Sequence, residues 1–468
     1  MTGCPPGGSL RFADTMTDVE ALLWDLEGKD PRLRSTITVV GVFDRPPDPA
    51  AVADRLERVS RSLPRLRQRV VAGPSPLSAP HWVLDGDFDM RYHLREVATA
   101  AGGSFADLLA LAEPLAAEGL DPVRPLWQVV LVGGLDAGRA AMVVKLHHCI
   151  TDGLGAVRLA TALFDPVRTP RGPVTPLPDL PAGLVPGMLE RLKDDVAAEV
   201  RRGAHLMRWV VPWALTNLRD AVTDPAPRTR ELVSLARSIR RAAQPVVEPC
   251  SPLMTGRSLG VRLDALELSL ARARRAAKRS GGTVNDVFLA GALGGLRLYH
   301  AKHGAFPPSL RIAVPVSTRA QGSDTDLHNQ VTPVRLRLPL QLGDPAERVR
   351  LVHELVAAER AQPAIGVAEY MAVAARRLPG AAELIAAAGA SVDAVASNVP
   401  GSPVPLYLGG ARIDRLVPFG PRLGAGCNLT VLSHVDTLHV GINMDPAATP
   451  DPGVLVGCLA AGFDETFG

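Results

Sequence analysis

Prolines recur every few residues between Asp165 and Pro186, and no other stretch constrains the fold of this chain as strongly. Proline lacks the backbone N–H that a helix interior or a central strand requires, so neither structure can continue through such a segment. We therefore interpret these residues as a linker between two folded bodies. The length of 468 residues agrees with this interpretation, because a domain usually contains about 100–200 residues.

Both flanking regions mix helical and extended patterns, which predicts an α/β fold on each side of the linker. The expected helices are Met16–Leu26, Ala50–Arg69, Leu154–Phe164, Leu263–Lys278 and Val284–His303. The expected strands are Thr36–Phe43, Trp127–Val132, Ala141–His148, Leu310–Val316, Val331–Leu338, Asn428–Leu432 and Thr437–Met444. We accordingly divide the chain into an N-terminal half at residues 1–165, a proline-rich linker with a helical crossover at residues 166–256, and a C-terminal half at residues 257–468.

Residues 187–220 carry apolar side chains at helical spacing, with Trp209 and Trp213 among them. Such a helix can pack against the protein or lie on a lipid surface. Acidic residues between Glu190 and Glu199 dilute the positive charge that an anionic lipid surface would favour. Packing against the protein is therefore the preferred interpretation, and membrane contact is the alternative.

The composition argues against several kinds of partner and compartment. The formal net charge of +3 is too small, and the aromatic share of 4% too low, for nucleic acid to be the main partner. Five scattered cysteines show neither a disulfide framework nor a CxxC metal site, which favours a reducing compartment. The N-terminus lacks a signal-peptide pattern, and no stretch approaches the ~20 apolar residues that span a bilayer. We expect a cytoplasmic or peripherally membrane-bound protein.

The clearest position for chemistry is the junction at which the strand Ala141–His148 meets a polar turn and a helix. His147 and His148 end the strand, where neighbouring side chains point to opposite faces, so one of them can face a given channel. A neutral imidazole can take the proton from an alcohol while the oxygen attacks a carbonyl, without a covalent intermediate. Asp152 precedes the helix and is best explained as its N-cap. A metal site would need a fourth ligand that this segment does not offer, so we expect no metal.

These residues belong to the segment HHCITDG, which matches the HHxxxDG signature of the coenzyme A-dependent acyltransferase superfamily. Four further segments resemble the bacterial wax ester synthase/diacylglycerol acyltransferase family: PLW at Pro125–Trp127, TVNDVFLA at Thr283–Ala290, VPVSTR at Val314–Arg319 and SNVPGSPVPLYLGGARI at Ser397–Ile413. The matches follow the family's order from about Asp18 to the final strands. The resemblance therefore covers nearly the whole chain.

The resemblance implies two chloramphenicol-acetyltransferase-like halves with an active-site tunnel at their interface. It makes His148 the general base, places His147 beside it in support, gives Asp152 the role of holding the loop, and lets Gly153 allow the turn. The implied reaction moves a long-chain fatty acyl group from acyl-CoA, which is a co-substrate and not a bound cofactor. The implied acceptor is diacylglycerol, giving triacylglycerol, or a fatty alcohol, giving a wax ester. Peripheral contact with the inner membrane or lipid droplets is expected with it.

Asn285 and Asp286 match an Asn-Asp motif of the same family. Thr283 and Asp286 also have the spacing of a capping box ahead of an apolar helix, which makes Asp286 structural. For Asn285, positioning of the substrate and a purely local hydrogen bond both stay open.

Ser397 and Asn398 match the family's SNVPG segment. Pro400 and Gly401 are expected to impose a turn there, which could bring polar groups to the tunnel. The group that stabilises the oxyanion is not apparent from the residues.

Two other features have less specific explanations. The basic run from Arg272 to Arg279 could meet the phosphates of coenzyme A, but we favour a solvated helix face. The segment GRSLG at Gly256–Gly260 has the spacing of a serine-hydrolase elbow, which needs a strand before it and a helix after it. A loop precedes it and a strand-like run follows it, so we interpret the match as chance.

Two competing functions remain open. The acyl group could pass to another hydroxyl acceptor such as a polyketide alcohol, which the histidine motif does not distinguish from diacylglycerol. The chain could also be a non-catalytic lipid-surface protein with the same fold. The intact HHxxxDG segment argues against the second alternative, because a scaffold has no physical need for a strand-end histidine at that spacing.

Overall fold

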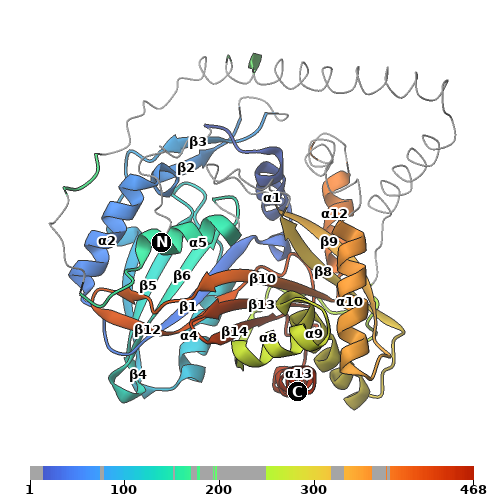
Figure 1. Ribbon diagram of the computed structural model, residues 1–468. Coiled ribbons are helices and arrows are strands. Elements are labelled where there is room, and N and C mark those ends of the chain that lie inside the picture. The colour runs from blue at the N-terminus through green and yellow to red at the C-terminus, as the bar shows by residue number, and fades with distance from the viewer. Residues whose placement is uncertain are drawn as a thin grey trace, which may run out of the picture.

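The computed structural model describes residues 14–73, 78–150, 153–169, 176–179, 193, 196–197, 249–317, 331–360, 376 and 380–468. Within these residues the strands form two six-stranded sheets and one small hairpin (Figure 1). The first sheet has the order β11 (Tyr407–Leu408), β12 (Ala411–Phe419), β1 (Thr36–Phe43), β6 (Ala140–His147), β5 (Trp127–Leu135) and β4 (Leu94–Gly103). The second has the order β7 (Arg262–Ser269), β14 (Thr437–Met444), β13 (Cys427–His434), β10 (Ala394–Ser402), β8 (Ser309–Ser317) and β9 (Val331–Pro339). The hairpin pairs β2 (Gln68–Val71) with β3 (His81–Leu84).

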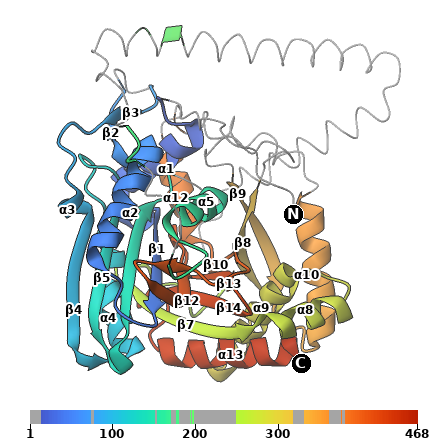
Figure 2. The same ribbon diagram turned by 60° about the vertical axis from the view of Figure 1, so that its left-hand side comes forward.

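Helices pack against both sheets, and the described residues form two α/β lobes side by side (Figure 2). The first lobe has α1 (Asp18–Lys29), α2 (Pro49–Ser62), α3 (Met90–His93), α4 (Phe105–Ala117), α5 (Gly153–Leu163) and the 3₁₀ turns η1 (Pro31–Leu33), η2 (Pro64–Arg67) and η3 (Asp136–Gly138). The second lobe has α8 (Leu270–Arg279), α9 (Val284–Lys302), α10 (Pro345–Arg360), α12 (Ala381–Ala390) and α13 (Pro452–Phe467). The predicted α/β class with two halves is confirmed.

The second lobe has its own apolar core, in which helices α8, α9, α10 and α13 cover one face of the second sheet. The first sheet carries apolar clusters on both faces, one of which includes α2 and α5. The other cluster packs α4 against this sheet and includes Leu263 from β7 of the second lobe. The two lobes therefore share buried apolar surface at α4, which fixes one against the other.

Strand β12 connects the lobes, because it lies late in the chain but pairs with β1 in the first sheet. It also lies against β13 and β14 of the second sheet. Gly420 and Pro421 directly follow β12 in the chain. Their carbonyls accept hydrogen bonds from the side-chain amides of Asn443 and Asn428, at 3.0 and 2.8 Å respectively. Residues 407–419 thus join the first sheet, and the division at residues 165 and 257 stays a prediction.

The prediction of one helix over Leu263–Lys278 is wrong in its first part. The structure has strand β7 at Arg262–Ser269, and α8 begins at Leu270. β7 pairs along its whole length with β14, from Arg262↔Met444 to Ser269↔Thr437. This long-range pairing overrides the local helical spacing, as tertiary context often does.

Two further predictions differ from the structure at positions next to a proline. The helix expected over Ala50–Arg69 ends at Ser62, since Pro64 follows and disfavours helical backbone in the residue before it. The turn expected at Pro400 and Gly401 is an irregularity inside β10, where the pairing with β13 shifts register between Val399 and Ser402. The strand therefore bulges there and does not end.

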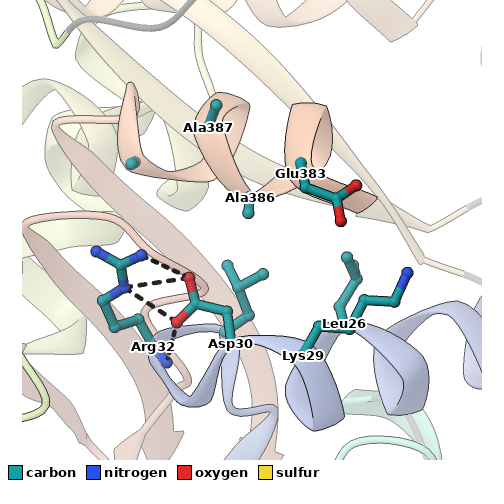
Figure 3. A pocket seen from close by; sticks show the side chains of 9 residues that line it. Leu26, Lys29, Asp30, Arg32, Glu383, Ala386 and Ala387 are labelled. Atoms are coloured by element: carbon teal, nitrogen blue, oxygen red, sulfur yellow. Dashed lines mark hydrogen bonds and ion pairs between the residues drawn. The ribbon is translucent and has the colours of Figure 1, made fainter. Parts of the chain in front are cut away.

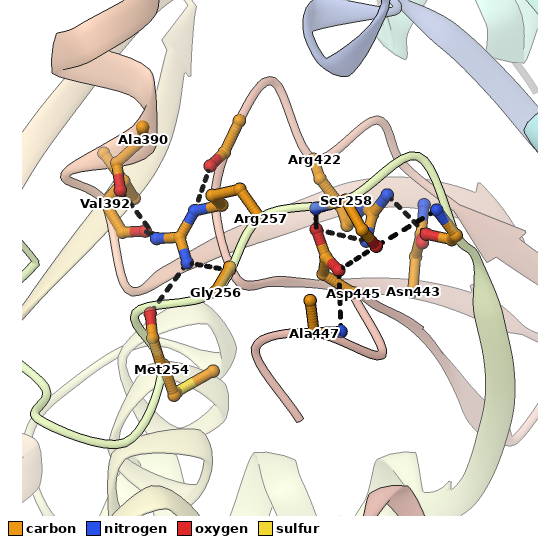
Figure 4. Close-up of polar contacts among 12 residues, drawn as sticks. Met254, Gly256, Arg257, Ser258, Ala390, Val392, Arg422, Asn443, Asp445 and Ala447 are labelled. Atoms are coloured by element: carbon orange, nitrogen blue, oxygen red, sulfur yellow. Dashed lines mark hydrogen bonds and ion pairs between the residues drawn. The ribbon is translucent and has the colours of Figure 1, made fainter. Parts of the chain in front are cut away.

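The GRSLG segment lies in a loop that leads directly into β7, so it lacks the helix of a hydrolase elbow (Figure 4). The Ser258 hydroxyl donates to Asp445 at 2.6 Å, and the Ser258 backbone N–H donates to the same carboxylate at 2.7 Å. Beside it, the Arg257 guanidinium donates to backbone carbonyls that include Ala390 at the end of α12 and Gly424, at 2.6 Å each. The segment joins loops of the second lobe, which agrees with the interpretation as a chance match.

The basic run on α8 is largely solvent-exposed, as expected. Arg274, Arg275 and Lys278 are exposed, while the alanines between them are buried against the core. Arg272 pairs with Asp464 of α13 at 3.1 Å. This arrangement is that of an amphipathic helix with its charged face in solvent.

Candidate active site

The histidine segment lies at the end of β6, in the middle of the first sheet. His147 is the last residue of this strand, the turn follows at residues 148–150, and Gly153 begins α5. The strand–turn–helix junction predicted from the sequence is confirmed. Asp152 lies outside the described residues, so its role as an N-cap stays a prediction.

Backbone hydrogen bonds from the neighbouring segments hold both histidines in place. The His147 N–H donates to the carbonyl of Leu126 at 3.0 Å, which is the central residue of the PLW segment. The His148 N–H donates to the carbonyl of Ser35, just before β1, at 2.8 Å. The indole N–H of Trp127 in turn donates to Leu66 at 2.7 Å. The PLW segment therefore supports the motif through its backbone.

His147 is 1% exposed, and both of its ring nitrogens have partners. Its Nδ1 accepts the backbone N–H of Cys149 at 3.1 Å, so in the neutral ring the proton lies on Nε2. Nε2 lies 2.8 Å from the Glu27 carboxylate on α1 and donates to it. Trp24 packs against the ring in a T-shaped arrangement, with the ring centroids 5.7 Å apart. His147 is thus held rigidly and has no lone pair left for an acceptor hydroxyl.

His148 has a different environment, although it is the next residue. It is partly exposed, whereas His147, Cys149 and Ile150 around it are buried. Burial raises the pKa of the Cys149 thiol well above its ordinary value, which keeps this cysteine a neutral, apolar neighbour. Of the two histidines, His148 is the one whose surface is partly exposed.

The carboxylate of Glu27 is held ionised beside this motif. Burial alone would raise its pKa, but the hydrogen bond from His147, the backbone N–H of Ser35 and the charge of Arg34 together lower it below the ordinary value. The Ser35 N–H lies 3.1 Å from the same carboxylate oxygen that His147 contacts. Glu27 is therefore a charged hydrogen-bond acceptor at neutral pH.

This lowered pKa predicts an acid-sensitive contribution to stability. A carboxyl whose pKa is lower in the folded than in the unfolded chain stabilises the fold above its unfolded pKa, about 4.3. This stabilisation is lost as the pH falls through the lower, folded-state pKa. We expect the difference in unfolding free energy between the wild type and Glu27→Gln to narrow on acidification from about pH 5. Urea unfolding across this range measures it, and a difference that stays constant down to pH 3.5 contradicts the expectation.

Asn285 and Asp286 lie at the start of α9 in the second lobe. The predicted capping box is confirmed: the hydroxyl of Thr283 accepts the Asp286 N–H, and the Asp286 carboxylate accepts the Thr283 N–H at 2.8 Å. Asp286 is buried and also bonds Nδ1 of His353 at 2.8 Å. Asp286 is therefore the capping residue of α9 and a partner of His353, while Asn285 is partly exposed beside it.

Ser397 and Asn398 point to opposite faces of β10, since they are consecutive strand residues. Ser397 pairs with Thr430 of β13, on the same face as Leu432, and Leu432 packs on the core of the first lobe. Helix α5, which follows the histidine segment, lies against β10. Ser397 therefore lies on the face of the second sheet that is turned toward the lobe with the histidines, and Asn398 is on the opposite face.

The sequence gives no local sign of the roles of Glu27 and Ser35. Glu27 is one of several acidic residues on α1, and nothing in its spacing distinguishes it from Asp25 or Glu20. Its contact with His147 joins residues 120 positions apart. A histidine in an active site is often oriented by a carboxylate, so the acidic residues of the sequence could have been considered for this role. Several of them would have fitted equally well.

A pocket of about 520 Å³ lies between α1, η1 and α12, where the two lobes meet (Figure 3). It is lined by Leu26, Lys29, Asp30, Arg32, Leu33, Glu383, Ala386, Ala387 and Ala390. Neither histidine of the motif lines this pocket, so the tunnel expected at His148 stays a prediction. In the part of the chain that the structure describes, no group of His, Cys, Asp and Glu side chains could hold a metal ion. No helix there has the length and apolar character to cross a bilayer.

Two such lobes, with paired histidines where a central strand meets its helix, define a chloramphenicol-acetyltransferase-like acyltransferase fold. Solved structures agree: a wax ester synthase/diacylglycerol acyltransferase from Marinobacter aquaeolei VT8 superposes with a TM-score of 0.63 at 22% identity, over 97% of this chain and 98% of that one. The first condensation domain of the CDA synthetase superposes with a TM-score of 0.57 at 17% identity, over 98% of each chain. These likenesses concern the fold.

The sequence comparisons define the family within this class. The profile of the wax ester synthase/diacylglycerol acyltransferase catalytic domain matches residues 16–288, and that of the WS/DGAT C-terminal domain matches residues 327–466. A Mycobacterium tuberculosis protein named a diacylglycerol O-acyltransferase is 36% identical, over 98% of this chain and 93% of its own length. A second one from that organism is 30% identical, over 96% of each chain. The chain belongs to the wax ester synthase/diacylglycerol acyltransferase family.

Proposed function

We propose that this protein transfers a long-chain fatty acyl group from acyl-CoA to the hydroxyl of diacylglycerol, which gives triacylglycerol. A fatty alcohol is the second acceptor and gives a wax ester. Membership of the family and the names of the relatives support this reaction class. The observation that carries it is the contrast between two adjacent histidines, of which His147 is buried and doubly bonded while His148 is partly exposed.

His148 acts as the general base in this proposal. Its imidazole takes the proton of the acceptor hydroxyl as the oxygen attacks the thioester carbonyl, so the C–O bond forms without an acyl-enzyme. The tetrahedral intermediate then collapses, the C–S bond breaks, and the imidazolium returns its proton to the departing sulfur of coenzyme A. His147 supports this step by keeping the turn rigid, and acyl-CoA is consumed as a substrate.

The other site residues have supporting roles in the same proposal. Asp152 holds the loop in shape and Gly153 allows the turn into α5. Asn285 is a candidate for positioning a substrate. Ser397, whose strand face is turned toward the first lobe, is a stronger candidate than Asn398 for contact with a substrate between the lobes.

We further propose that both substrates enter a passage between the lobes and that the protein contacts a membrane or lipid droplet peripherally in the cytoplasm. The water-insolubility of diacylglycerol and long-chain alcohols supports this location, because such acceptors are concentrated at lipid surfaces.

Product analysis tests the proposed reaction. We expect the full-length protein, given labelled palmitoyl-CoA, to form labelled triacylglycerol with diacylglycerol and a labelled wax ester with hexadecanol. A heat-inactivated sample is the control for chemical transfer. Absence of a labelled ester with both acceptors contradicts the proposal and favours a different hydroxyl acceptor or a non-catalytic role.

A further inference from the structure

We infer that Glu27 is a positioning residue that sets the orientation of both motif histidines. This inference rests on the proposed function, since it assigns Glu27 a purpose in the acyl transfer by His148. Glu27 lies on α1, outside the histidine segment and the four further segments quoted for the family resemblance.

A single oxygen of Glu27 joins the two strands that present the motif. Its Oε2 accepts Nε2–H of His147 at 2.8 Å and the backbone N–H of Ser35 at 3.1 Å. Ser35 precedes β1, and His147 ends β6, its neighbour in the sheet. The carboxylate therefore holds the start of β1 and the end of β6 together, next to the turn that carries His148.

The same contact reaches His148 through the backbone. The carbonyl of Ser35 accepts the His148 N–H at 2.8 Å, so Ser35 binds Glu27 with one end of its backbone and His148 with the other. Glu27 thus holds His147 through its ring and His148 through Ser35. Loss of the carboxylate oxygen would release both connections together, because among the described residues Glu27 is the one hydrogen-bond acceptor given for Nε2 of His147.

Helix α1 is itself held firmly, which makes Glu27 a fixed reference. Its start is closed by a capping box between Thr17 and Glu20. Arg376 of the second lobe donates to Asp25 on α1 at 2.9 Å and to the carbonyl of Ser78 at 3.1 Å. α1 therefore connects the second lobe to the histidine turn, and Glu27 is its contact with that turn.

Glu27 could act on the histidines through its negative charge or through its hydrogen bonds. These two roles predict different activities for the neutral variant Glu27→Gln. Oε2 makes both contacts, while Oε1 faces Arg34, whose Nε lies 3.9 Å away. Glutamine can keep an amide oxygen at the Oε2 position and retain both hydrogen bonds. Alanine removes them. Positioning therefore predicts that Glu27→Gln keeps most of the activity that Glu27→Ala loses.

The matched control is Glu113 on α4. Its side chain is 15% exposed, close to the 19% of Glu27, and it accepts a backbone N–H from Leu263 at 3.1 Å and pairs with Arg262 at 2.9 Å. Glu113 has the same kinds of partner but joins α4 to β7, away from the histidine turn. Glu113→Ala therefore measures how much kcat changes when a comparable carboxylate is lost at a place that does not contact the histidine turn.

We expect Glu27→Ala to lower kcat for palmitoyl transfer to hexadecanol roughly 10–100-fold, with KM for palmitoyl-CoA unchanged, because misplacing a reacting group reduces rate and not binding. Glu27→Gln restores most of this loss, and Glu113→Ala retains the wild-type kcat. Wild-type kcat in Glu27→Ala, or equal losses in all three variants, overturns the inference. A wild type that makes no ester, or a His148→Ala variant as active as the wild type, refutes instead the proposed function.

A spectroscopic measurement keeps the inference testable if Glu27→Ala does not fold. The ¹⁵N chemical shifts of the imidazole of His147 in the wild-type protein should be those of the Nε2–H tautomer, as the two contacts of the ring require. The Glu27→Gln variant should keep this tautomer. An Nδ1–H tautomer in the wild type would contradict the assigned hydrogen bonds and with them the positioning role.

Discussion

Replacing Gly441 with alanine is expected to lower the stability of the protein by about 1–3 kcal/mol. Gly441 lies on β14 at the place where it crosses β12, and a Cβ atom there would collide with the carbonyl group of Pro418. It would also lie 3.0 Å from the ring of Phe419. Since the first obstacle is backbone, no change of rotamer relieves it. The two lobes would have to separate locally where β12 connects them.

Thermal unfolding measures this effect, with Gly457→Ala as the matched control. Gly457 is an exposed residue within α13, and a Cβ atom there meets nothing within 4 Å. Alanine at an exposed helical position usually stabilises by about 0.5–1 kcal/mol relative to glycine. The melting temperature should therefore fall in Gly441→Ala and stay level or rise in Gly457→Ala. Equal melting temperatures for Gly441→Ala and the wild type would show that the lobes are less closely joined at β12 than described.

The parts of the fold that could be predicted have strong local patterns. The strands expected at Thr36–Phe43 and Thr437–Met444 have the same bounds as β1 and β14, because segments rich in apolar and β-branched residues end there at polar turns. The histidine junction at the end of β6 was predictable for the same reason. A buried central strand that stops at a turn leaves its last side chains at an edge of the sheet.

The parts that could not be predicted depend on residues far apart in the chain. The sequence of β7 has helical spacing, and its pairing with β14 makes it a strand. β12 joins the first sheet although it lies near the C-terminus. At the candidate site, Glu27 becomes recognisable when α1 packs beside the end of β6. Periodicity identifies which face of an element is apolar, but not which distant element will cover it.

Replacing His148 with alanine is expected to lower kcat for acyl transfer by about 10²–10⁴-fold, which is the usual contribution of general-base assistance. The alanine variant keeps the backbone N–H of residue 148 that donates to Ser35, and the contacts of His147 with Glu27 and Cys149. The matched control is His303→Ala. His303 is an exposed residue that follows α9 and pairs with Asp451 at the start of α13, so its loss should leave kcat unchanged.

The central claim is that the reachable imidazole of the pair takes the proton from the acceptor alcohol. The most direct test is the initial rate of labelled palmityl palmitate formation from saturating palmitoyl-CoA and hexadecanol, compared between the wild type, His148→Ala and His303→Ala at equal concentrations of folded protein. The account predicts a rate at least about 10²-fold lower for His148→Ala alone. A His148→Ala enzyme that forms the ester at the wild-type rate would contradict it.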